Sequence, residues 1–359
     1  MKKIDLYIIK KFLGTFFFMI LAFIVIAIVF DISENVDDLA KCSAPLSQII
    51  VDYYFNFAFY FGTQLISFIV FLTIIWFTSK LAQQSEIIAM LSGGISYKRI
   101  VLPYFMAACI LVALALTLTH LIVPRANKTK YNFEITHLKG AVTIQEKNIH
   151  REIKPGMIAY FYTFKPENKG GESFAIENWK NGQLQKKLLA NNAYYNDTTQ
   201  MWRLRNVRIR TIDSLQNERH QMIAQIDTVL PLKVDDFGLR AEISSAMTYG
   251  ELSDFIEAQK LSGSGKVAEF EIEKYNRTAT PFAIFVLTLI GVSIASRKQR
   301  GGTGLHLMLA IIIGFSFVFV ARIMAVSAVN LGFPAQYAVW IPNLLFGLLA
   351  IGLYQKAQK

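Results

Sequence analysis

The sequence contains 359 residues, 53% of them hydrophobic, and includes 28 Phe. This composition is too apolar for an ordinary soluble enzyme, so the distribution of the apolar residues decides the class of protein. The formal net charge is +11, but the cations gather in short loops between apolar segments. We therefore exclude nucleic acid as a partner and interpret the charge as membrane topology.

The apolar residues are concentrated at both ends of the chain. A helix needs about 20 mostly apolar residues to cross a bilayer, and the segments of suitable length are 12–30, 54–78, 101–123, 279–296, 305–329 and 337–354. The first segment is longer than a signal-peptide core, and no small-residue cleavage site follows it. The order predicts three spans in residues 1–123, a polar insertion in 124–278 and three further spans in 279–359.

The loop after the first span is acidic. Residues 31–52 contain a single lysine, Lys41, against the acids Asp31, Glu34, Asp37, Asp38 and Asp52. A weak divalent-cation site is one interpretation of this cluster, and an ordinary solvated loop is the simpler one.

The loop between the second and third spans reads SKLAQQSEIIAMLSGGISYKRIVLP. It predicts a short amphipathic helix over about 80–92, ended by Gly93-Gly94. Its apolar patch consists of Ile87, Ile88 and Leu91, and Glu86 is the only acid of the loop. Such a helix either docks into a groove on a partner protein or lies on the lipid surface, and the residues alone leave both open.

The polar insertion predicts a β domain. Residues 140–240 contain segments in which apolar and polar residues alternate, separated by turn signals. One of these signals is Asn181-Gly182, which is typical of a type I′ hairpin. In one strand Trp202 and Leu204 alternate with arginines, and the phase then slips by one residue at Asn206. A bulge there would keep both apolar pairs on one face, the second pair being Val207 and Ile209. That face either packs a sandwich core or holds an acyl chain.

The end of the insertion predicts two helices, about 248–260 and 266–278, separated by the sequence GSGK. This tetrapeptide resembles part of a phosphate-binding loop, which requires G-x-x-x-x-G-K-[ST]. Lys260 occupies the first glycine position and Val267 the hydroxyl position. The chain therefore has no nucleotide site of this type, and we expect no cofactor.

The short loops predict the orientation, because basic residues remain in the cytoplasm. Lysines and arginines occupy the N-terminus, the second-to-third loop, the fourth-to-fifth loop and the tail, which all lie on one side if there are six spans. Both termini are then cytoplasmic and the β domain is outside. Residues 279–359 contain no Asp or Glu, which argues against a carboxylate-based carrier in this half.

Several segments, in order, resemble the LptF/LptG permease family. The pattern E-x-x-A-x-x-x-x-G-I-S, formed by Glu86, Ala89, Gly94, Ile95 and Ser96, is similar to the family's coupling helix. The start of the family's sequences resembles MKKIDLYIIKKF in this chain. The family's fourth span with its following loop resembles KYNRTATPFAIFVLTLIGVSIASRKQRGG, and its last span resembles LGFPAQYAVWIPNLLFGLLAIGLY. The resemblance implies a polytopic α-helical membrane protein with six transmembrane helices (3+3) and an inserted periplasmic all-β, jellyroll-like domain.

The resemblance also implies the partners and the mechanism. The expected partners are a homologous six-span permease subunit, a dimeric cytoplasmic ABC ATPase that uses the ATP, and periplasmic jellyroll bridge proteins. The expected cargo is lipopolysaccharide, extracted from the inner membrane. The coupling residues would be Glu86, Ile87, Ala89, Leu91 and Gly94.

The family's lipid gate lies between the first and fifth spans. In this sequence its candidates are Phe16, Phe17, Phe23 and Phe30 in the first span and Arg322 in the fifth. Arg322 either binds a lipid phosphate or extends to the headgroups, and each phenylalanine is alternatively an ordinary lipid-facing residue. Family members tend to carry basic residues at the outer end of the first span, where this chain carries acids.

Two other classes of function remain as alternatives. A membrane-bound enzyme acting on lipid-linked substrates would need a catalytic constellation near the outer interface, and the five His residues are scattered. A scaffold that anchors an outer complex gives no reason for the patterned loop helix.

Overall fold

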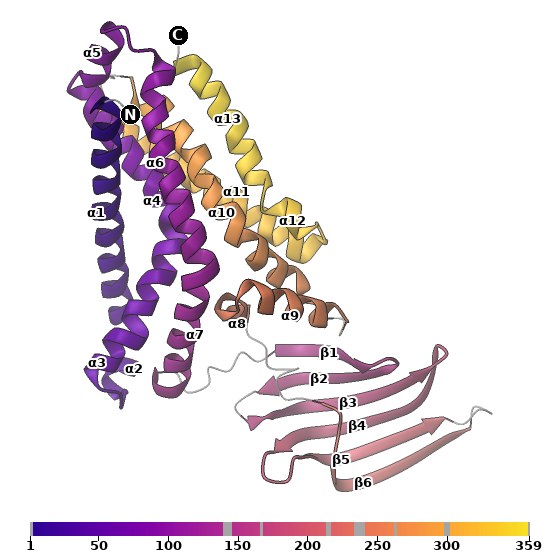
Figure 1. The fold of residues 1–359 in the computed structure, drawn as a ribbon. Helices are drawn as coiled ribbons and strands as arrows, with labels where there is room; N and C mark the ends of the chain where they lie inside the picture. The colour runs from indigo at the N-terminus through magenta and orange to yellow at the C-terminus, as the bar shows by residue number, and fades with distance from the viewer. Residues whose placement is uncertain are drawn as a thin grey trace. The chain divides into compact units, whose positions relative to one another are not determined.

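The computed structural model describes residues 3–138, 146–165, 168–212, 217–232, 241–261, 264–297 and 302–357. The chain forms two compact units. A helical unit contains residues 1–134, 245–250 and 268–359, and a second unit, built around a sheet, contains 135–244 and 251–267 (Figure 1).

Six helical runs in the described chain are long and apolar enough to cross a membrane, as predicted. They comprise Lys3–Glu34, Leu46–Gln83, Tyr97–Leu138, Val267–Ala295, Thr303–Leu331 and Ala335–Ala357. The runs extend beyond the predicted apolar cores because polar helical turns continue past the membrane-length segment. The boundary expected at 123/124 accordingly lies inside one continuous helical run, and the one expected at 278/279 lies within another.

The described helices of both units follow one another in chain order. They are α1 (Lys3–Glu34), α2 (Val36–Lys41), α3 (Leu46–Gln48), α4 (Phe55–Gln83), α5 (Glu86–Ser92), α6 (Tyr97–Thr117), α7 (Val123–Phe133), α8 (Ala241–Ala246), α9 (Tyr249–Leu261), α10 (Val267–Ala295), α11 (Gly302–Leu331), α12 (Ala335–Ala338) and α13 (Ile341–Ala357). Wider π-helical turns at Ile49–Tyr54, Leu118–Ile122 and Glu134–Leu138 join or extend some of them. The N-terminus, the C-terminus and α5 lie at one end of this unit, and α2 and α3 lie at the other (Figure 1).

Helix α4 is the centre of the helical unit. Buried residues of α4 pack in one apolar cluster with α1 and α6 and in another with α10, α11 and α13. Helices α1 and α11 both lie against α4, yet only 17% and 11% of their most apolar windows are buried within the chain. These two helices therefore bury the smallest share of their apolar windows among the six candidate spans.

Pro281 sits inside α10 and is held by three neighbouring helical segments. A proline has no N–H, so the carbonyl four residues earlier, that of Arg277, loses its helical partner. Thr119 donates its hydroxyl to that carbonyl at 3.1 Å, and the side chains of Ser67 and Asn343 donate to the carbonyls of residues 280 and 279. These bonds satisfy the backbone around the proline and join it to α4 and α13.

The predicted all-β insertion is confirmed. Its strands are β1 (Glu146–Lys154), β2 (Met157–Lys165), β3 (Gly170–Lys180), β4 (Gln183–Asn196), β5 (Met201–Ile212) and β6 (Glu218–Thr228). They pair antiparallel in sequence order, as a meander. The expected hairpin joins β3 to β4: Asn181 and Gly182 have φ of 51° and 74°, as a type I′ turn requires.

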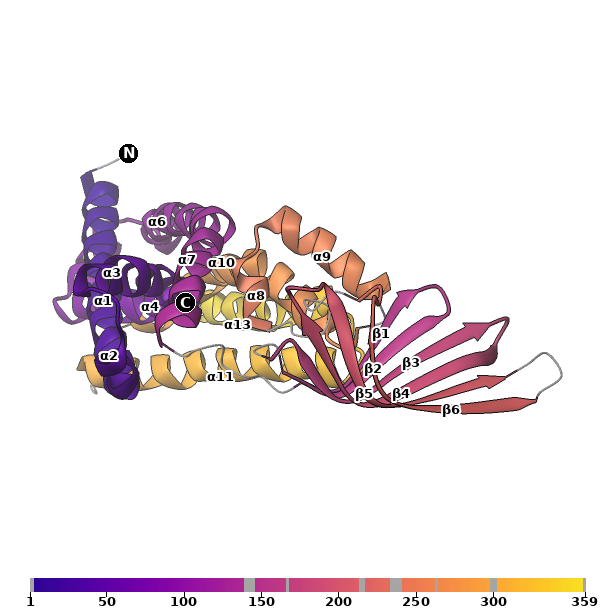
Figure 2. The same cartoon turned by 90° about the horizontal axis from the view of Figure 1, so that it is seen from below.

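A crease crosses all the strands of this sheet. Every pair of neighbouring strands has at least one unpaired position there, and β4–β5 has two. The unpaired residues that lie in one row are Asn148, Tyr162, Ser173, Asn191, Asn206 and Ala224. Two of them, Ser173 and Asn206, have φ of 52° and 53°. The register is the same on both sides of Asn206, so the expected bulge with an inserted residue is wrong, and a local change of backbone conformation produces the phase slip. Figure 2 shows the sheet bent across its strands.

The crease places apolar residues from both arms of the sheet on one inner face. Trp202, Leu204 and Val207 are at most 1% exposed, and Ile209 packs partly buried beside them. The rings of Phe161 and Phe174 lie 4.6 Å apart, and Trp202 stacks on Phe174 at 6.5 Å. The bent sheet therefore encloses its own aromatic core.

The outer face of the sheet carries cross-strand ion pairs. Lys187 lies 2.8 Å from Glu177 and Arg203 lies 3.0 Å from Asp227, while Arg210 pairs with Glu218. The hydrogen bond from each cation lowers the pKa of its carboxyl partner below the usual value.

The lowered carboxyl pKa values predict acid sensitivity of the sheet. A carboxyl whose folded pKa lies below its unfolded pKa stabilises the fold above the unfolded value, and this stability is lost as the pH falls through the folded pKa. We expect the melting temperature of the sheet to fall between about pH 5 and pH 3. Tryptophan fluorescence on heating measures it, with Trp76→Phe and Trp340→Phe removing the emission of the helical unit.

The matched variants are Glu177→Gln with Asp227→Asn and Glu218→Gln, which should flatten the profile. Glu172→Gln on the exposed side of β3 is the control and should leave the profile unchanged. A wild-type melting temperature that is constant over this range would contradict the prediction.

Candidate functional site

Helix α5 begins after a break in the backbone rather than as a continuation of α4. The helix expected over about 80–92 is shorter, because α4 runs to Gln83 and Ser85 adopts φ of 59° before α5 starts at Glu86. At the end of α5, Gly94 has φ of 80°. The N–H of Gly94 donates to the carbonyl of Leu91, and the N–H of Ile95 donates to the carbonyl of Met90. This is a Schellman motif, which requires the left-handed conformation that glycine adopts most readily.

The two faces of α5 have different roles. Ile87 is 1% exposed and packs in the core with residues of α1 and α6, so its predicted place in an exposed patch is wrong. Ile88 and Leu91 are 45% and 43% exposed, and Ala89 is also exposed. The outer face therefore offers a small apolar surface, and the inner face fixes α5 to the bundle.

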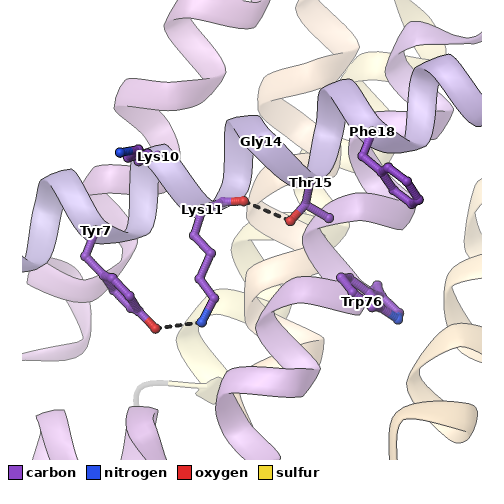
Figure 3. Close-up of a pocket in the computed structure, with 7 residues that line it drawn as sticks. All are labelled: Tyr7, Lys10, Lys11, Gly14, Thr15, Phe18 and Trp76. Carbon is purple, nitrogen blue, oxygen red and sulfur yellow. Dashed lines mark hydrogen bonds between the residues drawn. The ribbon is translucent and has the colours of Figure 1, made fainter.

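Glu86 is bonded to the first helix. The Tyr7 hydroxyl donates to Glu86 Oε2 at 3.1 Å, and Lys11 Nζ donates to the Tyr7 oxygen at 2.6 Å. Figure 3 shows Tyr7 and Lys11 side by side on α1. The only acid of the loop is thereby linked to the start of α1 through a tyrosine and a lysine.

A second polar contact joins the start of α1 to the start of α6. Arg99 Nη2 lies 2.7 Å from Asp5 Oδ2, and the Asp5 side chain is 5% exposed. Such a buried carboxylate needs its cation, because a buried unpaired charge is strongly destabilising. The only sequence signal for this pair was an acid placed among basic residues near the N-terminus.

Helix α11 is fixed to α4 at the same end of the bundle. His306 is buried, and its Nδ1 lies 2.8 Å from Ser79 Oγ. Further along, Gly314 permits close approach, because a Cβ there would lie 2.7 Å from Phe68 Cε2. Both highly exposed helices, α1 and α11, therefore have direct polar contacts to the α4–α5–α6 region.

The sequence that forms these six apolar helices, the inserted sheet and the short loop helix matches a known protein family. The family model described as "Lipopolysaccharide export system permease LptF/LptG" matches residues 6–356. The chain belongs to the LptF/LptG family. A relative, the lipopolysaccharide export system permease protein LptG of Haemophilus influenzae (strain ATCC 51907 / DSM 11121 / KW20 / Rd), is 24% identical over 270 residues. The aligned part covers 74% of each chain.

As a member of the LptF/LptG family, the chain is a multi-pass inner-membrane protein of the permease type. Its predicted gate residues are distributed as follows. Phe17 and Phe30 are exposed on α1, and Phe23 packs partly buried against the core. Phe16 is 1% exposed inside that core, so it supports α1 from within and does not line an open cavity.

Arg322, the gate candidate of the fifth span, is exposed on α11. It lies nine residues before Leu331, where α11 ends, which corresponds to roughly 13 Å along the helix axis. Within this LptF/LptG chain the helices that carry these candidates, α1 and α11, each pack on α4.

One acid near the C-terminal end of α1 has a structural role that the sequence did not indicate. Asp31 Oδ1 accepts hydrogen bonds from the Tyr53 hydroxyl and from Asn35 Nδ2, both at 3.2 Å. Tyr53 is buried, and Lys130 lies over its ring at 5.8 Å. Asp31 therefore holds α1 against the segment that leads into α4, whereas Glu34 and Asp37 are exposed.

The segment of residues 245–250, which returns the chain to the helical unit, is anchored by buried polar groups. Arg277 is buried and donates from Nη1 to the carbonyl of Met247 at 2.8 Å. Asn127 donates to the carbonyl of Ser245 at 3.2 Å, and Lys274 lies over the ring of Tyr249. These anchors were not predicted, although an arginine four residues before Pro281 was an available signal.

Proposed function

We propose that this chain is one of two homologous permease subunits of an ABC-type exporter that extracts lipopolysaccharide from the inner membrane. A separate cytoplasmic ATPase dimer powers the exporter, and the cargo passes to a periplasmic jellyroll bridge. The observation that carries the proposal is the construction of α5. This helix exposes Ile88, Ala89 and Leu91 while Glu86 and Ile87 contact α1.

In this proposal α5 is the helix that docks on the ATPase. Its exposed apolar surface with one carboxylate suits a groove lined by apolar and cationic side chains. The contact of Glu86 with Tyr7 and the packing of Ile87 give a direct connection from the docking site to α1. Movement of α5 would then displace α1, because packed contacts transmit displacement between neighbouring helices.

The orientation is part of the proposal. The N-terminus, α5 and the C-terminus lie at one end of the helical unit (Figure 1), and the basic loop residues cluster in these segments. Basic loops face the cytoplasm, so the sheet lies in the periplasm. The exposed faces of α1 and α11 would complete the lipid gate together with the corresponding helices of the second subunit.

Affinity purification in mild detergent tests the proposal. A soluble ATPase and a second six-span subunit should copurify in fixed proportion, with ATPase activity in the eluate. A chain that purifies alone and without activity would contradict the exporter assignment, and activity on a lipid-linked substrate by the chain alone would favour the membrane-bound enzyme. An outer complex that copurifies without an ATPase would favour the scaffold.

Arg322 provides a local test of the gate. The replacement Arg322→Ala should lower photo-crosslinking of lipopolysaccharide to α1 and α11 several-fold, because a guanidinium binds phosphate with two charge-assisted hydrogen bonds. Arg322→Lys should retain part of the signal. The control is Arg297→Ala at the opposite end of the bundle, and unchanged crosslinking in Arg322→Ala would indicate that the side chain extends to bulk headgroups.

A further inference from the structure

A groove lies between α1 and α4 near the end of the bundle that carries α5. It has a volume of about 550 Å³ and is open on one side. Its lining residues, labelled in Figure 3, are Tyr7, Lys10, Lys11, Gly14, Thr15, Phe18 and Trp76. The volume is in the range of pockets that hold small molecules or single lipid chains.

One end of the groove is cationic. Lys10 and Lys11 both line it, none of the lining residues is acidic, and the Lys80 ammonium lies 5.4 Å from the centre of the Trp76 ring. The Tyr7 hydroxyl accepts from Lys11 at 2.6 Å and donates to Glu86 Oε2 at 3.1 Å, so the carboxylate of Glu86, which is not a lining residue, stands beside this end. The Lys11 ammonium lies beside the Tyr7 hydroxyl, and the Lys10 side chain leaves α1 in another direction (Figure 3). Each ammonium group can donate hydrogen bonds to the oxygens of a phosphate group.

The other end of the groove is apolar. Gly14 leaves open space, with no atom within 4 Å of where a Cβ would stand. Phe18 is 73% exposed, and Trp76 forms the opposite wall from α4 (Figure 3). The Thr15 hydroxyl is already bonded to the Lys11 carbonyl at 2.8 Å, so it adds no free donor. From Lys11 to Phe18 the helix rises roughly 10 Å, which gives an apolar channel below the cations.

We propose that this groove binds one anionic phospholipid of the leaflet next to α5. The phosphate lies at the lysine end of the groove, and one acyl chain lies along Gly14, Phe18 and Trp76. Charge complementarity selects an anionic headgroup, and the apolar channel selects a lipid over free phosphate. The bound lipid is distinct from the proposed cargo, which is extracted from the opposite leaflet.

Trp76 gives a direct readout of the acyl chain. The full-length protein is placed in nanodiscs of phosphatidylcholine that contain a small guest fraction of either phosphatidylglycerol or phosphatidylcholine with brominated acyl chains. Bromine quenches a tryptophan that it touches, and subtracting the signal of Trp76→Phe removes the contribution of the other tryptophans. Brominated phosphatidylglycerol should occupy the groove about fivefold more strongly, as expected for a lysine near a membrane surface.

The test variant is Lys10→Gln with Lys11→Gln, and the matched control is Lys98→Gln, an exposed lysine at the same end of the bundle that does not line the groove. The preference for the anionic lipid should disappear in the double variant and persist in the control. Equal quenching by the two guest lipids in the wild type would overturn the proposal. An equal loss of preference in both variants would also overturn it, because the effect would then be general surface charge.

Competition with inorganic phosphate distinguishes a phospholipid site from a site for free anions. Excess inorganic phosphate should leave quenching by brominated phosphatidylglycerol unchanged, because the acyl chain contributes to binding. If phosphate alone removes the preference, the groove is an anion site and not a lipid site.

Discussion

Replacing Glu86 with lysine should abolish lipopolysaccharide transport while leaving the protein inserted in the membrane. The carboxylate is the only charged side chain that α5 offers to a partner, and it already accepts from Tyr7. Truncating one member of a hydrogen-bonded charge pair at an interface costs about 2–5 kcal/mol, so ATPase docking should weaken at least about 30-fold. Copurified ATPase and transport in reconstituted vesicles are the two measurements.

Tyr7→Phe is the matched control for this prediction. It removes the hydroxyl that contacts Glu86 but keeps the carboxylate and the packing of the ring. ATPase docking should therefore persist in Tyr7→Phe, while coupling of ATP hydrolysis to transport should fall. Normal transport in Glu86→Lys would refute the docking role of α5, and loss of docking in Tyr7→Phe would show that Glu86 acts within this chain.

Replacing Trp202 with alanine should unfold the sheet unit. The indole is 1% exposed, stacks on Phe174 and lies 5.5 Å from the ring of Tyr195. Truncating a buried aromatic residue costs about 3–5 kcal/mol, which is a large part of the roughly 5–15 kcal/mol that stabilises a typical domain. We expect proteases to cleave within residues 146–228 of this variant while the helical unit stays folded, whereas the wild-type sheet resists them.

Trp179→Ala is the control for this change, since Trp179 is 40% exposed near the hairpin of β3 and β4. Its replacement should leave protease resistance intact. Sensitivity of the same degree in both variants would indicate that the aromatic core does not determine the stability of the sheet.

The helical architecture could be predicted from the sequence because its signal is local. Each span is an apolar run of membrane length, and each run appears as a long helix. The hairpin between β3 and β4 could also be predicted from the sequence, because Asn181-Gly182 specifies its turn by backbone preference alone. In both cases the residues that determine the structure are neighbours in the chain.

The contacts of the candidate site could not be predicted, because they join distant segments. The spacing of apolar residues placed Ile87 in an exposed patch with Ile88 and Leu91. In the structure Ile87 packs against α1, whereas Ile88 and Leu91 are exposed. The pairs Tyr7–Glu86 and Asp5–Arg99 are separated by 79 and 94 residues. Nothing in one sequence indicates which acid meets which donor at that separation.

The crease of the sheet has a mechanical consequence. Along the row from Asn148 to Ala224 the strand pairing is already interrupted, so changing the angle between the two arms breaks no further ladder bond. All strands cross the row together, so the two arms can hinge about one line. The angle between the two arms, and with it the packing of the aromatic core, can then change while the register of every strand is kept.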